Sequence, residues 1–146
     1  MNNVASRLVT SFNAPSPLLR RALLIDAVLT AVTGIALVLA AGPLSAVLGL
    51  PTALLRSAGA IFIPYGAFAG WLGTRPRVYR PLVFALIVLN ALWAVDSVLL
   101  LLSRWLEPTP WGEIFIVAQA VFTGVIAEVQ FIGLRRSTVV ESYARL

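Results

Sequence analysis

The stretch RRALLIDAVLTAVTGIALVLAAG (residues 20–42) decides how this chain folds. After its two arginines, Asp26 is the one charged residue in the run. A helix rises about 1.5 Å per residue, so about twenty apolar residues cross a hydrocarbon core of about 30 Å. A secretory signal peptide would have a shorter apolar region, about 7–15 residues, and would rarely contain an aspartate. The stretch is therefore predicted to be a transmembrane helix.

The composition of the whole chain agrees with this prediction. Of its 146 residues, 60% are hydrophobic and 12% are charged, and the mean hydropathy is +0.93. An average soluble domain is about 25% charged. A chain of this size leaves much of its surface outside any core, so the sequence predicts a single domain whose surface faces lipid.

The residue types that are missing exclude several classes of chemistry. The chain has no Cys and no His, and every basic residue is an arginine. Disulfides, thiolate chemistry, zinc sites, His-ligated haem and lysine Schiff bases are therefore excluded. No phosphate-binding loop or nucleophile–base pair is found either, so the sequence favours a protein that is not an enzyme.

Three further apolar runs are long enough to span a bilayer, at residues 52–73, 82–102 and 111–134. Residues 43–51, bracketed by prolines, are too short and are interpreted as an interfacial turn or short surface helix. The fold class predicted is all-α, an integral membrane four-helix bundle. Its organisation is an N-terminal arm at 1–19, read as an interfacial helix or partly ordered, a transmembrane domain at 20–136 and a tail at 137–146.

The arginines predict the topology. Nine of them lie before the first run, between the second and third runs, or after the fourth run; they are Arg7, Arg20, Arg21, Arg75, Arg77, Arg80, Arg135, Arg136 and Arg145. The other side carries only Arg56 and Arg104. Cytoplasmic loops are richer in Arg and Lys, so both termini are predicted to be cytoplasmic, in a bacterial inner membrane. Because the arginines flank apolar runs, they do not indicate nucleic-acid binding.

Two pairs of segments resemble each other. LLIDAVLTAV (23–32) matches IVLNALWAVD (87–96) with Asp26 laid on Asn90, and GWLGTR (70–75) resembles QFIGLR (130–135). Each half of the chain would then be a two-helix hairpin, and the halves would be related by an approximate twofold axis along the membrane normal. Chance similarity between apolar segments explains the matches equally well.

The segments LGLPTALLRSAG (48–59) and GTRPRVYRPLVFAL (73–86) resemble the DoxX-like group of small bacterial membrane proteins. The resemblance covers about forty of the 146 residues and consists mostly of turn signals and apolar positions. It implies a four-helix bundle, and some members of the group are associated with quinone-linked or oxidative-stress complexes. It transfers no catalytic residue to this chain.

Acidic residues inside the predicted helices need a physical explanation, because a carboxylate at the bilayer centre costs about 2.5–3.5 kcal/mol. Asp26 lies close enough to Arg20 and Arg21 to pair with them or to reach the interface. Thr30 continues its helix face at i+4. An interhelical hydrogen-bond network is the preferred interpretation for Asp26.

Asp96 lies deeper in its helix, and Arg56 is predicted at a comparable but shallower depth on the same side. An Asp96–Arg56 ion pair that fastens two helices is the preferred interpretation. A proton-binding or ligand-binding site is the alternative. Glu128 lies on nearly the opposite helix face from Gln119, Thr123 and Gln130. This helix is therefore expected to contact protein on two sides, which favours an oligomer or a larger assembly.

Other intramembrane side chains are expected to join helices. Asn90 is predicted to bridge helices by hydrogen bonds, which average about 0.6 kcal/mol in membranes. Trp93 and Tyr65 are interpreted as packing residues, with contact to a quinone or lipid as the alternative. Gly66 and Gly70 form a small-xxx-small pattern that allows another helix to approach closely.

Three functions remain open from the sequence. The first is a non-catalytic accessory subunit that self-associates or binds other membrane proteins, without a cofactor. The second is a small proton-coupled transporter or channel that uses Asp26, Asp96 and Glu128. The third, which rests largely on the resemblance to the DoxX-like group, is a quinone- or lipid-binding protein in which Tyr65, Asn90 and Trp93 line a cleft.

Overall fold

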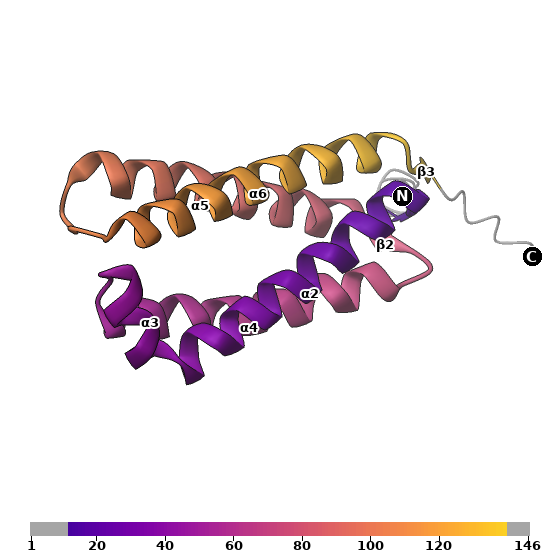
Figure 1. Cartoon of the computed structure of the whole chain (residues 1–146). Coiled ribbons are helices and arrows are strands. Elements are labelled where there is room, and N and C mark those ends of the chain that lie inside the picture. The colour runs from indigo at the N-terminus through magenta and orange to yellow at the C-terminus, as the bar shows by residue number, and fades with distance from the viewer. Residues whose placement is uncertain (1–11, 140–146) are drawn as a thin grey trace, which may run out of the picture.

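The computed structural model describes residues 12–139, and these are almost wholly helical (Figure 1). The helices are α2 (Pro17–Leu39), α3 (Ala41–Leu48), α4 (Thr52–Thr74), α5 (Arg80–Ser103) and α6 (Pro110–Arg135). The strands are β1 (Phe12–Ala14), β2 (Val78–Tyr79) and β3 (Thr138–Val139).

The all-α four-helix bundle predicted from the sequence is confirmed. The four long helices α2, α4, α5 and α6 are each long and apolar enough to cross a membrane. Their bounds lie within about three residues of the predicted spans, a usual uncertainty for helix ends. The short helix α3 occupies the segment expected to be too short to cross. These four helices are the feature expected of a multi-pass membrane protein.

The bundle consists of two helical hairpins, α2–α4 and α5–α6. The hairpins lie close together at the end that carries the strands and diverge toward the end that carries α3 (Figure 1). Helix α2 packs along α4 and also contacts α6, whereas α4 and α5 do not pack closely along their backbones. One side of the bundle, between α4 and α5, is therefore more loosely closed than the others.

Helix α2 begins at Pro17 because Ser16 caps it. The Ser16 hydroxyl accepts a hydrogen bond from the Leu19 amide at 3.2 Å, and proline is well suited to the first helical position. The same hydroxyl donates to the Gly133 carbonyl at 2.7 Å, and the Ser16 amide donates to Ser137 Oγ at 3.0 Å. This single residue thus starts α2 and ties it to the end of α6.

Thr109 plays a similar part at the opposite end of the bundle. It caps α6 by accepting from the Gly112 amide at 3.2 Å, and its hydroxyl donates to the Val47 carbonyl at 2.6 Å. Its backbone amide donates to the Leu48 carbonyl at 3.0 Å. The loop before α6 is therefore fastened to the end of α3.

A small three-stranded antiparallel sheet, with the order β2-β1-β3, joins the three segments at the termini end. The sequence did not predict these strands. The N-terminal arm was expected to be an interfacial helix or partly ordered up to residue 19, but residues 12–14 form β1 and α2 starts three residues early. Residues 1–11 and 140–146 lie outside the described part of the chain. Strand pairing gives hydrogen-bond partners to the backbone N–H and C=O groups of these three segments, which lie outside the helices.

Glycines allow α2 and α4 to pack closely. A Cβ atom at Gly59 would lie 2.6 Å from the Gly34 carbonyl oxygen, and one at Gly66 would lie 2.9 Å from the Ala27 carbonyl oxygen. The predicted close approach at Gly66 is thus confirmed. Gly70, its partner in the predicted pattern, has ordinary contact at 3.4 Å from Ala27 Cβ. Contact at Gly34 and Gly59 brings the two backbones together as small residues do in membranes.

Candidate functional site

The polar centre of the bundle is Asp26, which is 0% exposed. Four side chains, one from each transmembrane helix, donate hydrogen bonds to its carboxylate. Thr30 donates to Oδ1 at 3.1 Å, while Oδ2 accepts from Tyr65 Oη at 2.8 Å, Asn90 Nδ2 at 2.9 Å and Gln130 Nε2 at 2.8 Å. Asn90 Nδ2 also lies 3.3 Å from Gln130 Oε1. We call these five residues the Asp26 cluster.

In the Asp26 cluster all four neighbours donate and the carboxylate accepts. Hydrogen bonds between membrane helices average about 0.6 kcal/mol, and those to charged groups are stronger, about 1.5–3 kcal/mol. Even at about 0.6 kcal/mol each, four bonds offset most of the cost of about 2.5–3.5 kcal/mol for an acid in the membrane. The cluster therefore explains how Asp26 is tolerated and how it joins all four helices.

The expected hydrogen-bond network at Asp26 is thus present, whereas pairing with a neighbouring arginine is wrong. Arg20 instead donates to the Arg75 carbonyl at 3.4 Å, and Asp26 lies inside the bundle rather than at the interface. Asn90 bridges helices, as predicted. Gln130 was not predicted to belong to this site, and no local pattern around it in the sequence singled it out.

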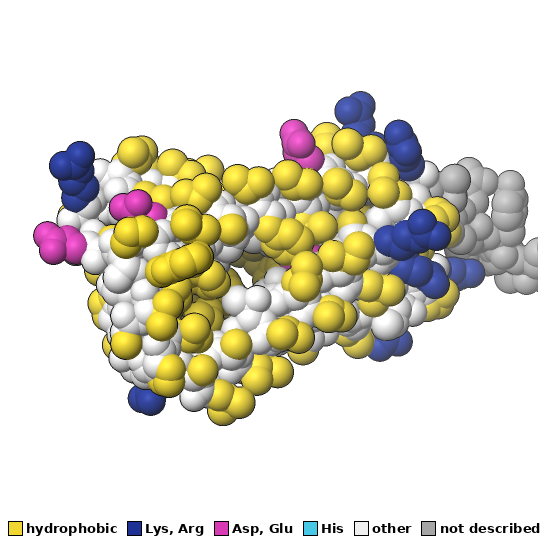
Figure 2. Space-filling model, in the orientation of Figure 1, with side chains coloured by type: hydrophobic (Ala, Val, Ile, Leu, Met, Phe, Trp, Pro, Cys, Tyr) yellow, Lys and Arg dark blue, Asp and Glu magenta, His cyan; other side chains and the backbone are white. Residues whose placement is uncertain are grey.

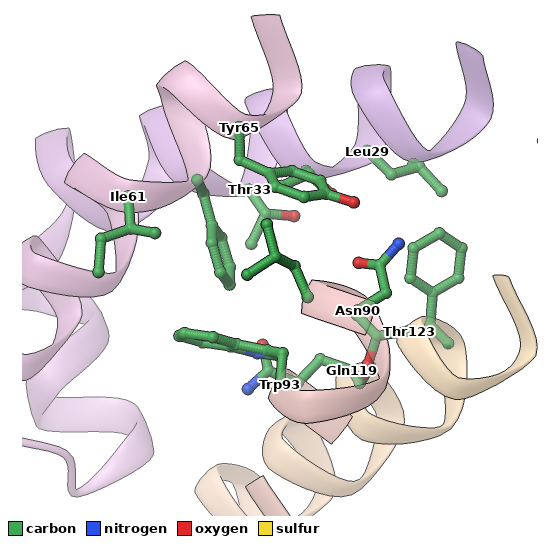
Figure 3. A pocket seen from close by; sticks show the side chains of 12 residues that line it. Leu29, Thr33, Ile61, Tyr65, Asn90, Trp93, Gln119 and Thr123 are labelled. Carbon is green, nitrogen blue, oxygen red and sulfur yellow. The ribbon is translucent and has the colours of Figure 1, made fainter. Parts of the chain in front are cut away.

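A cavity of about 160 Å³ lies beside the Asp26 cluster. Figure 3 shows side chains around it from all four transmembrane helices. Three residues come from each helix: Leu29, Thr30, Thr33, Ile61, Phe62, Tyr65, Leu89, Asn90, Trp93, Gln119, Phe122 and Thr123. Thr30, Tyr65 and Asn90 belong to both the cluster and the cavity wall, so Asp26 lies directly behind neutral polar side chains.

Trp93 lines this cavity and also contains a buried polar atom without a hydrogen-bond partner among the described residues. Its Nε1 atom is buried and has no hydrogen-bond partner in residues 12–139. The indole packs edge-on against Phe62, with the ring centroids 4.8 Å apart, and so connects α5 to α4. The packing role predicted for Trp93 is therefore present, together with a donor that lacks a partner. Tyr65, for which the same alternatives were open, binds Asp26 through its hydroxyl.

A second cavity, of about 80 Å³, lies on the other side of Trp93 and Gln119, which line both cavities. Asp96 lines this second cavity but is an exposed residue. Arg56 is exposed as well, and no salt bridge joins the two within the described residues. The predicted Asp96–Arg56 pair is therefore wrong in this structure, because both side chains are exposed and no ion pair joins them.

Glu128 lies on the exposed surface of α6, away from the Asp26 cluster. On the same helix, Gln130 is buried, and Gln119 and Thr123 line the first cavity. The predicted division of polar groups between two faces of this helix is confirmed. Asp26 and Glu128 do not meet, so the three acidic residues proposed for proton transport do not form one chain of groups.

Within residues 12–139, no group of three or more acidic, histidine or cysteine side chains could hold a metal ion. Comparison with protein-family models, curated proteins and solved structures finds no match for this chain. The resemblance to the DoxX-like group stays a prediction. The site must therefore be interpreted from its own geometry.

Proposed function

We propose that this protein is a non-catalytic membrane protein that binds an apolar small molecule, a lipid or a quinone-like compound, inside its bundle. The observation that supports this function best is the cavity between the four helices. Ligand sites are typically lined by apolar and aromatic side chains with a few placed polar groups. Here Phe62, Phe122 and Trp93 supply aromatic surface, while Tyr65 and Asn90 present polar atoms held in place by Asp26.

The opening of the cavity also supports a ligand that comes from the bilayer. Ile61 on α4 and Leu89 on α5 line the cavity and are exposed. They lie on the loosely packed side between the two hairpins. The space-filling view shows a hollow between the upper and lower hairpins, bordered by hydrophobic side chains (Figure 2). An apolar molecule could enter there without crossing water.

Filling the cavity is expected to remove the bound molecule. Thr33→Leu would place extra methyl groups in the cavity, whereas Val32→Leu, one residue earlier, changes an exposed side chain, 59% exposed. After gentle purification from native membranes, mass spectrometry of extracted small molecules should find one compound enriched with the wild type and with Val32→Leu. Thr33→Leu should retain at least about tenfold less, equivalent to about 1.4 kcal/mol. Equal retention by Thr33→Leu, or no enriched compound with the wild type, would contradict the proposed function.

A second candidate function, an accessory subunit that self-associates or binds other membrane proteins, is favoured by Glu128. An exposed carboxylate about seven residues, or 10 Å, inside the end of α6 is costly in lipid unless it reaches the interface or a protein partner. The same native-membrane preparation tests this function. A co-purifying protein or oligomer that is lost in Glu128→Ala would support it, and a monomer in every gentle detergent would contradict it.

We also propose that both termini face the cytoplasm of a bacterial inner membrane. Dark blue arginine side chains gather at the termini end in Figure 2, and acidic side chains lie mainly at the opposite end. The arginine side chain of Arg75 packs over Trp71, with its guanidinium carbon 4.5 Å from the ring centroid, at this same end. Tryptophan is common at both membrane boundaries, whereas an excess of arginine is typical of the cytoplasmic one.

The natural absence of cysteine makes this orientation easy to test. Single cysteines introduced as Arg77→Cys, near β2, and Trp105→Cys, after α5, should label from opposite sides of the membrane. A membrane-impermeant maleimide added to intact spheroplasts should label Trp105→Cys and should reach Arg77→Cys only after lysis. The reverse pattern would overturn the proposed orientation.

A further inference from the structure

Glu128 is an exposed acid in the membrane-spanning part of α6, and neither the Asp26 cluster nor the first cavity uses it. Its side chain forms no ion pair or hydrogen bond within residues 12–139. Glu128 lies about seven residues, or 10 Å, inside the end of α6 at Arg135. A carboxylate in this position is costly in lipid unless a neighbour neutralises it, so a cation at the same depth is the expected partner.

Arg21 is a cation at nearly the same depth. The Ser16 hydroxyl donates to the Gly133 carbonyl at 2.7 Å, so these two residues mark one level of the bundle. Arg21 lies about five residues beyond Ser16 on α2, and Glu128 lies about five residues before Gly133 on α6, which is about 7–8 Å along each helix. Both charged side chains are exposed, and they do not pair with each other in the described part of the chain. One chain therefore carries both charges and leaves them apart.

Each charge stands at one end of an apolar seam on the outer surface of its helix. Contact residues at alternating steps of four and three are typical of helices that pack along a partner. The α2 seam has this spacing and consists of Arg21, Ile25, Val28, Val32, Ile35 and Leu39, which are all exposed. The α6 seam has it as well and consists of Ile114, Val117, Val121, Gly124 and Glu128, of which Gly124 is half-buried.

The two seams match when α2 of one copy lies along α6 of a second copy. Copies inserted in the same orientation place these two helices antiparallel, because α2 and α6 run in opposite directions across the membrane. At equal depth, Arg21 of one copy then lies opposite Glu128 of the other. The same register places Ile25 opposite Gly124, a small residue of the kind that lets membrane helices approach closely.

Contacts between identical seams do not satisfy the charges. Packing α6 on α6 around an axis along the membrane normal brings Glu128 beside the Glu128 of the second copy. Packing α2 on α2 does the same for Arg21. Like charges placed together disfavour an interface, whereas an α2–α6 contact pairs opposite charges, and arginine offers several donors to a carboxylate.

We propose that the α2 seam of one copy packs on the α6 seam of a second copy, with an ion pair between Arg21 of one copy and Glu128 of the other. This inference rests on self-association, the second candidate function, and it identifies the partner as another copy of this chain and the helices that meet. It does not depend on the proposed ligand, because neither seam lines the first cavity.

The absence of cysteine from the natural chain permits a crosslinking test in native membranes. One copy carries Val28→Cys and one affinity tag, and a second copy carries Val121→Cys and a different tag. The register places these positions opposite each other, and a disulfide that joins the two tags reports contact between copies. Leu92→Cys replaces Val121→Cys in the matched control, because Leu92 and Val121 are equally exposed, at 59%. Leu92 also lies at the depth of Val28, since Asn90 bonds to Asp26.

Oxidation should crosslink Val28→Cys to Val121→Cys and leave the control pair at background. Glu128→Gln in the Val121→Cys copy keeps the shape of the side chain but removes its charge. It should lower the crosslink yield about three- to tenfold, the effect of one polar contact between membrane helices. Glu128→Arg should lower the yield further, and Arg21→Glu in the Val28→Cys copy should restore it by reversing the pair.

A yield no higher for Val121→Cys than for the control pair would overturn the proposed contact. Migration as an oligomer on a native gel would then keep self-association through another surface, whereas migration as a monomer would overturn the second candidate function as well. Equal yields with Glu128 and with Glu128→Gln would overturn the ion pair. This last comparison also decides the matter if a charge-reversed chain fails to insert.

Discussion

Replacing Asp26 with alanine is expected to lower the free energy of unfolding by about 3 kcal/mol. The substitution removes four hydrogen bonds at once and leaves the donors of Tyr65, Asn90 and Gln130 buried without their acceptor. Because these donors come from three other helices, the loss should loosen the whole bundle. To measure the effect, the protein in mild detergent micelles is titrated with a denaturing detergent, and the loss of helix is monitored by circular dichroism.

Asp96→Ala is the matched control, since it removes the same side chain from an exposed position with no salt bridge to Arg56. It should leave the unfolding transition almost unchanged. If Asp96→Ala destabilises the protein as much as Asp26→Ala, or if Asp26→Ala has no effect, the Asp26 cluster does not hold the four helices together.

Replacing Gly59 with alanine is expected to cost about 2–3 kcal/mol through overpacking. The added Cβ would lie 2.6 Å from the Gly34 carbonyl oxygen and 2.8 Å from Val38 Cγ2. Backbone atoms of α2 cannot move aside without separating α2 from α4. The same detergent titration should show the loss, and crosslinks between cysteines introduced on the two helices should form more slowly.

Gly42→Ala provides the control for Gly59→Ala. Gly42 lies in α3 and has nothing within 4 Å of an added Cβ. Alanine is a better helix former than glycine, but Pro43 disfavours a helical residue with a Cβ directly before it, so the two effects offset each other and this variant should be about as stable as the wild type. Equal losses from both glycine variants would show that close helix approach is not the reason for Gly59.

The Asp26 cluster and the cavity depend on each other. Tyr65 and Asn90 line the cavity, and their positions are set by hydrogen bonds to Asp26. A site with polar groups held this way is arranged before a ligand arrives, which reduces the cost of binding. Asp26 is thus a positioning residue for the proposed ligand, rather than a group that contacts it.

Several features of the site were accessible from the sequence. An acid in an apolar run must be satisfied inside the membrane, which pointed to Asp26, and Thr30 at i+4 was expected on its face. An intramembrane asparagine was expected to bridge helices, and Asn90 does so. The same argument failed for Asp96, because the rotation of α5 turns Asn90 and Ser97 into the bundle and leaves Asp96 exposed.

The sequence by itself determined the four spans, their ends and the distribution of arginines at the two ends of the bundle. The hydropathy and the arginine content of a segment depend only on the residues in that segment, so the local sequence is sufficient to predict them. The predicted helix ends agree with the structure within about three residues for this reason.

Only the tertiary structure decided which face of each helix turns inward. Apolar residues surround these helices on all sides, so the usual contrast between a buried and a solvated face is absent, and helix rotation is set by contacts between helices. Those contacts placed Gln130 on Asp26, left Asp96 exposed, and brought Trp93 to a cavity without a partner for its N–H. Each depends on residues far apart in the chain, which no local pattern contains.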